Sequence, residues 1–211
     1  MNILCLNTAF KTAQIAVSGK KDVFVSLEAN AKSSENVLPA VEEALINAGL
    51  EIADIDHIGV VVGPGSFTGV RVGVALVKGF LACFPNIKAV AVDSLDLMAT
   101  EWQTKGKEKN FCAVQNALSG RFFVKSYQNF VPITESSLQQ QLPSVFKIGL
   151  ESERLSEVDA FVEPTCQTLL AITKNLIEKS EFVTGQNLTP VYLRLSQAEE
   201  NLLKKEQNAE N

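Results

Sequence analysis

The chain has 211 residues, of which 46% are hydrophobic and 20% charged, proportions that are ordinary for a soluble globular protein. Its 24 acidic and 19 basic residues give a formal net charge of −5, and the sequence shows no basic stripe. Because neutralised phosphates supply most of the affinity of proteins that bind nucleic acid alone, direct and unaided RNA binding is the weaker expectation.

The N-terminus and the cysteines give no sign of export or of membrane insertion. The first apolar run, Ile3–Leu6, lacks a basic start and stops at Asn7, which is not the pattern of a signal peptide. The four cysteines are widely spaced and form no CxxC pair, so neither a disulfide framework nor a cysteine metal site is expected. The longest apolar helix pattern is too short to span a bilayer. We therefore expect a cytoplasmic protein without membrane contact.

The first half of the chain predicts a layer of strands and helices. Residues 2–29 contain three short apolar runs separated by turn-like segments, which predicts a meander of three strands. The segment "SSENVLPAVEEALINAGL" then changes to a helical period. A buried strand "HIGVVVG", a helix over Val70–Phe84, a strand "IKAVAVD" and a helix "SLDLMATEW" follow, the last capped by Asp93 or Ser94. This order predicts an α/β fold with a mixed sheet.

The second half predicts a separate lobe. The polar, charged stretch Gln103–Asn110 indicates a boundary, so we expect an N-terminal lobe over residues 1–105 and a smaller C-terminal lobe over 106–211. We predict a hairpin around Asn116–Gly120 and a loop over Thr134–Pro143. A helix in "TCQTLLAITKNLIEKS" and a short extended piece in "TPVYLRL" follow. The final "AEENLLKKEQNAEN" is expected to be a solvated helix that frays into a tail.

The segment "GPGSFTG", Gly63–Gly69, lies between the buried strand and the apolar helix, and two kinds of catalysis can be tested against it. A serine nucleophile elbow needs glycine two positions before Ser66, but Pro64 stands there. The only histidine, His57, begins the preceding strand, whose length places it about 15–20 Å from the loop. One histidine also falls short of the usual ligand set of a metallopeptidase. We expect no catalytic residue and no metal site here.

The same segment matches neither standard nucleotide fingerprint, GxxxxGK[ST] or GxGxxG. Anion binding stays open, because Pro64–Gly65 suits a type II turn, and Ser66 or Thr68 can cap the helix and leave the N–H groups of Gly69 and Val70 free. The alternative is a tight turn from strand to helix without a ligand. The residues of this possible anion or nucleotide loop are Gly63, Gly65, Ser66, Thr68 and Gly69.

Arg71 stands in the first turn of the predicted helix. The helix macrodipole disfavours a cation there by about 0.3–1 kcal/mol. We therefore expect a carboxylate or phosphate near Arg71, on this chain, on a ligand or on a partner.

The helix after the loop is apolar almost all round. Gly69 and Gly73 are four residues apart, as are Ala75 and Gly79, and such spacing forms flat grooves that another helix can approach closely. One side of the helix must cover the sheet, and the other is either internal or faces a second protein. The predicted partner-facing residues are Gly69, Val70, Arg71, Gly73, Val74, Val77 and Lys78.

With "GPGSFTGVRVG" in a strand–loop–helix setting, the sequence resembles the TsaB family of bacterial tRNA threonylcarbamoyladenosine biosynthesis proteins. The segments "ILCLNTAFKTAQIAV", "SSENVLPAVEEAL", "VDSLDLMA" and "PVYLR" occur in the family's order. The resemblance implies a two-lobed actin-like ATPase (ASKHA) fold and a scaffold without catalysis of its own. Such a scaffold pairs with the catalytic subunit TsaD, which transfers threonylcarbamoyl to the adenosine next to the anticodon, and with the ATPase TsaE. The helix after the loop would pair with TsaD or with a second copy, and tRNA would be contacted only indirectly.

The chain also departs from the family's pattern. The family commonly has aspartate where this chain has Asn7, and an Asp-Ala-Arg turn where it has Asn116-Ala117-Leu118. An amide carries no charge and binds magnesium poorly. We therefore expect no intrinsic cofactor, with ATP or ADP bound at most within the complex. A nucleotide-dependent phosphotransferase or hydrolase is the alternative hypothesis, and a peptidase is the least favoured.

Overall fold

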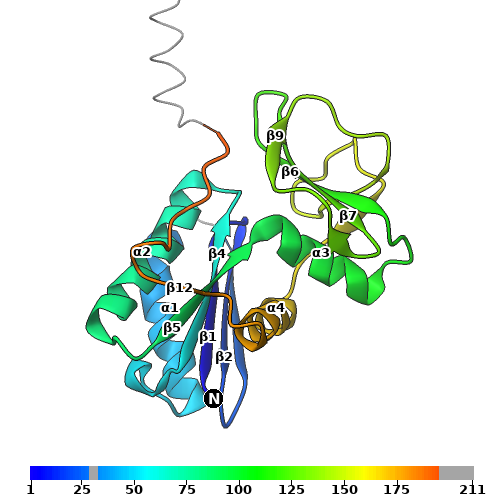
Figure 1. The fold of residues 1–211 in the computed structure, drawn as a ribbon. Coiled ribbons are helices and arrows are strands. Elements are labelled where there is room, and N and C mark those ends of the chain that lie inside the picture. The colour runs from blue at the N-terminus through cyan, green and yellow to red at the C-terminus, as the bar shows by residue number, and fades with distance from the viewer. Residues whose placement is uncertain (29–32, 195–211) are drawn as a thin grey trace, which may run out of the picture.

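The computed structural model describes residues 1–28 and 33–194, and it contains two β-sheets joined by a helix (Figure 1). In this described part, no helix is both long and apolar enough to cross a bilayer. The predicted tail "AEENLLKKEQNAEN" lies outside the described residues.

The first sheet has six strands in the order β12-β5-β4-β1-β2-β3. The predicted meander is confirmed, because β1, β2 and β3 pair antiparallel in sequence. β4 runs parallel to β1 and to β5, so the sheet is mixed as predicted. The bounds are β1 Ile3–Asn7, β2 Thr12–Ser18, β3 Val23–Glu28, β4 His57–Gly63, β5 Lys88–Asp93 and β12 Phe182–Val183.

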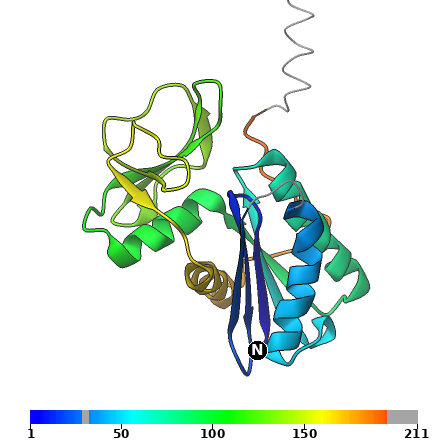
Figure 2. The same ribbon diagram turned by 180° about the vertical axis from the view of Figure 1, so that it is seen from behind.

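Helices cover both faces of this sheet (Figure 2). α1 (Ser33–Ala48) and α2 (Phe67–Cys83) lie together on one face, and α4 (Cys166–Glu178) lies on the other. A short 3₁₀ helix, η1 (Ile52–Asp54), precedes β4. α2 begins three residues earlier than the sequence predicts. One apolar face of this helix packs against β4.

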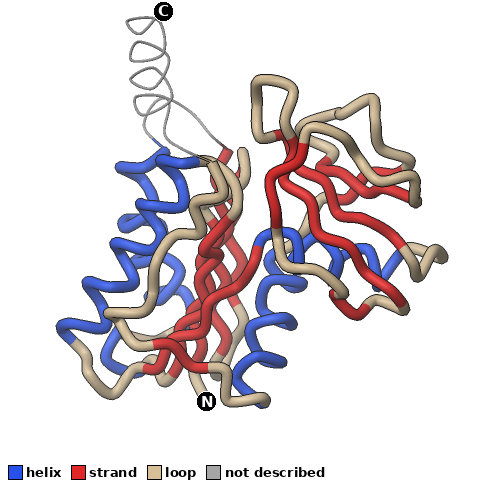
Figure 3. Tube along the Cα trace, turned by 45° about the horizontal axis from the view of Figure 1, so that its top comes forward, coloured by secondary structure: helices blue, strands red, loops and turns tan. Residues whose placement is uncertain are grey.

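The second sheet forms the other group of strands in Figure 3, drawn in red on the right. Its strand order is β11-β10-β6-β7-β8, with β9 paired to β7. The predicted hairpin is confirmed as β6 and β7. The loop predicted over 134–143 is partly wrong, because it contains β9, which adds to the open edge of β7. The bounds are β6 Phe111–Asn116, β7 Phe122–Gln128, β8 Val131–Pro132, β9 Ser137–Gln139, β10 Phe146–Leu150 and β11 Ala160–Val162.

Helix α3 (Ser94–Lys105) joins the two sheets, and Asp93 caps it as predicted. Lys125, on β7 of the second sheet, forms ion pairs with aspartates at the start of this helix. The Nζ of Lys125 lies 2.8 Å from the Asp96 carboxylate and 3.7 Å from that of Asp93. The Tyr127 hydroxyl donates a 2.8 Å hydrogen bond to Asp96. This cluster holds the second sheet against the end of β5.

After β11 the chain returns to the first sheet. α4 packs on that sheet, and β12 pairs antiparallel with β5 at its edge. The N-terminal layer is therefore built from both ends of the chain, and residues 166–183 lie with it. The division into domains at residue 105 stays a prediction. The fold class, α/β with mixed sheets flanked by helices in two lobes, is confirmed.

Candidate functional site

The glycine-rich loop connects β4 to α2 and carries the helix cap that the sequence predicts. Ser66 is the N-cap, and its hydroxyl accepts a 3.2 Å hydrogen bond from the Gly69 N–H. The predicted type II turn is wrong, because the Gly63–Pro64 bond is cis and Gly65 has φ of +159° rather than about +80°.

The loop's glycines face the protein's own chain. A Cβ at Gly65 would lie 2.6 Å from the Ala9 carbonyl oxygen, and one at Gly69 would lie closer still to that of Thr8. The Ser66 N–H donates to Ala9 O at 2.9 Å, and the Thr8 hydroxyl donates to Gly69 O at 2.6 Å. The turn between β1 and β2 therefore lies directly on the glycine loop and requires glycine at both positions.

The N–H groups assumed to be free for an anion are in use. The Gly69 N–H donates to the Ser66 hydroxyl, and the Val70 N–H donates to Ser66 O at 2.9 Å. That part of the anion hypothesis is wrong. Whether an anion binds elsewhere on the loop, for instance near Thr68, stays a prediction.

Asn7, at the end of β1, is a buried structural residue. Its amide nitrogen donates to Gln14 at 2.9 Å, and its amide oxygen accepts from the Ala9 N–H at 3.0 Å. Gln14 in turn donates to Pro164 O, where the chain crosses back from the second sheet. Both polar atoms of Asn7 thus have partners. Within residues 1–28 and 33–194, no group of three His, Cys, Asp or Glu side chains could hold a metal ion.

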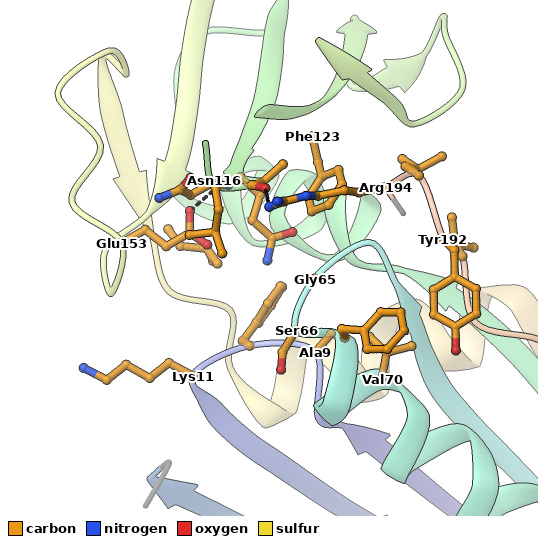
Figure 4. Close-up of a pocket in the computed structure, with 18 of the residues that line it drawn as sticks. Ala9, Lys11, Gly65, Ser66, Val70, Asn116, Phe123, Glu153, Tyr192 and Arg194 are labelled. Carbon is orange, nitrogen blue, oxygen red and sulfur yellow. Dashed lines mark hydrogen bonds between the residues drawn. The ribbon is translucent and has the colours of Figure 1, made fainter. Parts of the chain in front are cut away.

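A cleft of about 580 Å³ separates the glycine loop from the second sheet (Figure 4). Burial raises the pKa of Glu153 to about 7, and the Asn116 N–H donates to its carboxylate at 2.7 Å. Arg194 donates to Ala117 O on the same side. The walls are otherwise mainly apolar: Ala9, Phe10, Phe67, Val70, Ala117, Leu118, Phe123, Leu150, Val191 and Leu193.

In the described part of the chain, the cleft has no cluster of side chains that could hold the metal ion of a magnesium nucleotide. Such a group needs oxygen ligands for the ion together with free N–H groups or cations for the phosphates. Asn7 has both of its polar atoms engaged, and the predicted N–H donors are used. Two cations, Lys11 and Arg194, line the cleft together with Glu153. The described residues thus offer no magnesium site, and the absence of an intrinsic cofactor stays a prediction.

The only histidine lies far from Ser66 along β4, as predicted. His57 is the first residue of the strand, and its ring stacks on Phe182 at 5.6 Å. Burial lowers its pKa below the ordinary value. The structure thus does not bring a serine and a base together at the glycine loop.

Helix α2 divides the predicted interface residues into two groups. Gly73, Val74 and Val77 are buried, as is Val70, and a Cβ at Gly73 would clash with the Thr8 hydroxyl. Gly69 likewise packs on Thr8. The four buried residues cannot contact a partner in the folded chain, so their assignment to the surface is wrong, whereas Gly69 is half-buried. Of the predicted set, only Arg71 and Lys78 are exposed.

The exposed face of α2 carries the second pair of small residues noted in the sequence. Ala75 and Gly79 are exposed, and a Cβ added to Gly79 would have no neighbour within 4 Å. They lie four and eight residues after Arg71, on one stripe of the helix. This open stripe, and not the Gly69–Gly73 pair that packs on Thr8, is the surface that a second helix can approach.

Arg71 has aromatic neighbours where the sequence predicts an anion. Its guanidinium carbon lies 4.0 Å from the ring centroid of Phe67, and its Nε donates a 2.8 Å hydrogen bond to the Tyr192 hydroxyl. No described carboxylate pairs with it. Sequence reasoning missed Phe67 and Tyr192, although the segment "PVYLR" was among those that carried the resemblance.

Comparisons with known proteins identify the family of this chain. The family model described as "TsaD: tRNA N6-adenosine threonylcarbamoyltransferase" matches residues 12–154. The Escherichia coli "tRNA threonylcarbamoyladenosine biosynthesis protein TsaB" is 25% identical over 98% of this chain and 100% of its own length. The Bacillus subtilis protein of the same description is 37% identical over 47% of this chain and 44% of its own length. The chain belongs to the TsaB family.

Two solved structures from Pseudomonas aeruginosa share the fold. One, described as YeaZ, has a TM-score of 0.76 and 20% identity, over 91% of this chain and 99% of its own. The other, described as an uncharacterized protein with similarity to peptidase YEAZ, has a TM-score of 0.78 and 21% identity, over 92% and 99%. The fold of this chain is thus shared with both structures over nearly their whole length.

Proposed function

We propose that this chain acts in tRNA threonylcarbamoyladenosine biosynthesis, as a non-catalytic scaffold that pairs with a TsaD-like catalytic subunit and a TsaE-like ATPase. The similarity to E. coli TsaB over nearly the whole of both chains supports the pathway. The match to the TsaD family model supports a TsaD-like partner, because related folds commonly pair through equivalent surfaces.

The observation that carries the scaffold role is the packing of the glycine loop. Thr8 and Ala9 lie against the glycines that would have to admit a phosphate, and no histidine is among the residues that line the cleft beyond them. The glycine loop thus serves to position α2, whose open stripe at Ala75 and Gly79 is available to a partner. Alone, the chain would pair with a second copy through the same stripe.

Nucleotide and tRNA would both be bound by other subunits of the complex. Any ATP or ADP of the complex is held by the partner subunits, because both polar atoms of Asn7 are engaged within the chain and the described residues form no cluster of magnesium ligands. The tRNA meets the catalytic subunit, and a chain of net charge −5 meets it only indirectly. A cytoplasmic location stays a prediction.

The test is reconstitution of the reaction. Purified TsaD and TsaE subunits from the same genome are incubated with unmodified tRNA, ATP and threonylcarbamoyl donor, with and without this chain. Mass spectrometry of the digested nucleosides measures the modified adenosine. We expect it to accumulate only when the chain is present. Equal yield without the chain, or modification by the chain alone, would contradict the scaffold role.

A further inference from the structure

Arg71, at the start of α2, lies against two aromatic rings, one on the same helix and one in the segment that follows β12. The guanidinium carbon of Arg71 lies 4.0 Å from the ring centroid of Phe67 and 5.5 Å from that of Tyr192. The two rings contact each other, with 5.1 Å between their centroids. A 2.8 Å hydrogen bond from Nε to the Tyr192 hydroxyl fixes the rotation of the guanidinium. We call Arg71, Phe67 and Tyr192 the arginine clamp.

Arg71 is held in place, and no carboxylate among residues 1–28 and 33–194 pairs with it. The dipole of α2 disfavours positive charge in its first turn. The cation–π interaction with the aromatic faces offsets this by about 0.5–1 kcal/mol at an exposed site. Its two terminal nitrogens have no hydrogen-bond partner in the part of the chain that the structure describes. Because the side chain is exposed, a partner protein can reach them. By contrast, Lys125 and Lys105 both pair with carboxylates.

The clamp leaves the arginine ready for a planar anion. A guanidinium stacked on a ring keeps its N–H groups in its own plane, where they point away from the ring face. Because Nε is already bonded to Tyr192, the terminal pair forms a fork of defined orientation. Carboxylates match that fork with two parallel hydrogen bonds.

The position of the clamp identifies where the anion comes from. Arg71 begins the open stripe of α2, and Ala75 and Gly79 continue it without side chains that would hold a partner away. Arginine and tyrosine are also among the residues that most often anchor protein interfaces. An anion that reaches Arg71 along this stripe belongs to the protein that packs on it.

We propose that the arginine clamp binds a carboxylate side chain of the partner subunit, held by the two terminal nitrogens of Arg71. This inference rests on the proposed function, since it names the chemistry that the partner of α2 must present. Tyr192 is a positioning residue. It is placed by its neighbours, because the Val191 N–H donates to Val62 O at 2.8 Å and Arg194 donates to Ala117 O.

The test is the affinity of the full chain for the TsaD subunit of the same genome, measured at low and high ionic strength. Arg71→Gln should weaken binding about tenfold, equivalent to about 1.4 kcal/mol, and should reduce its salt dependence. Tyr192→Phe keeps the ring but removes the hydroxyl, and should give a smaller loss. Lys20→Gln is the matched control, since it removes one exposed charge in the turn between β2 and β3 and should change nothing.

The outcomes separate this inference from the proposed function. If the wild-type chain binds TsaD and Arg71→Gln binds equally well, the clamp is not a docking point, while the proposed function stands. A tenfold loss with unchanged salt dependence would show a packing role and overturn the carboxylate. If the wild-type chain does not bind TsaD, both ideas are overturned. Arg71→Lys, which keeps the charge without the fork, should bind between wild type and Arg71→Gln.

Discussion

Two glycines of α2 should respond oppositely to the same substitution. A Cβ at Gly69 would lie much closer to the Thr8 carbonyl oxygen than 3.0 Å, the shortest distance that Cβ atoms normally show. A Cβ at Gly79 would have no neighbour within 4 Å. Gly69→Ala must therefore displace the turn between β1 and β2. Gly79→Ala adds a methyl group to an open helix surface and should stabilise the chain by about 0.5–1 kcal/mol.

The size of the Gly69→Ala effect follows from what the displaced turn would lose. Backbone overpacking costs about 1–3 kcal/mol, and the hydrogen bonds from Thr8 to Gly69 O and from Ser66 to Ala9 O are each worth about 0.5–1.5 kcal/mol. We expect a loss of about 2–6 kcal/mol in the free energy of unfolding, measured by urea titration. If Gly69→Ala unfolded at the same urea concentration as wild type, the reasoning that the turn fills the loop would be refuted.

Three further predictions concern other parts of the molecule. Val77→Asp should prevent folding, because Val77 is fully buried, whereas Ala75→Asp should leave the circular dichroism melting curve unchanged and weaken partner binding by at least about tenfold. Lys125→Met should destabilise the fold by about 3 kcal/mol in urea, since two aspartates at the start of α3 lose their cation. Burial raises the pKa of Glu153 to about 7, so the folded state holds its proton more tightly, and stability should fall as the pH rises from about 4.5 to 7. Glu153→Gln should remove that part of the pH dependence, and an unchanged profile would contradict the assignment.

Local patterns predicted most of the first layer. Alternating and continuous apolar runs identified β1 to β5, and the helical period identified α1 to α3. The return of the chain to the first sheet was not visible, because β12 has two residues and its pairing with β5 spans about half the chain. The same limit applies to β9, β10 and β11, which are short and held by neighbours distant in sequence.

The site shows why spacing alone did not identify the exposed face of α2. Gly69–Gly73 and Ala75–Gly79 have the same separation of four residues, so spacing cannot distinguish the inner pair from the outer one. In the folded chain, Thr8 packs on Gly69 and Gly73, which leaves Ala75 and Gly79 on the outer face. The cap at Ser66 was predictable because it depends only on local backbone, whereas the contact of Arg71 with Tyr192 joins residues 121 positions apart.

The most direct test compares a surface variant with a cleft variant in the reconstituted reaction. The yield of modified adenosine is measured with wild-type chain, with Ala75→Asp and with Glu153→Gln. If the chain works through the open stripe of α2, Glu153→Gln should support full modification, and Ala75→Asp, although folded, should support almost none. Full modification with Ala75→Asp together with its loss in Glu153→Gln would contradict the account and place the function in the cleft.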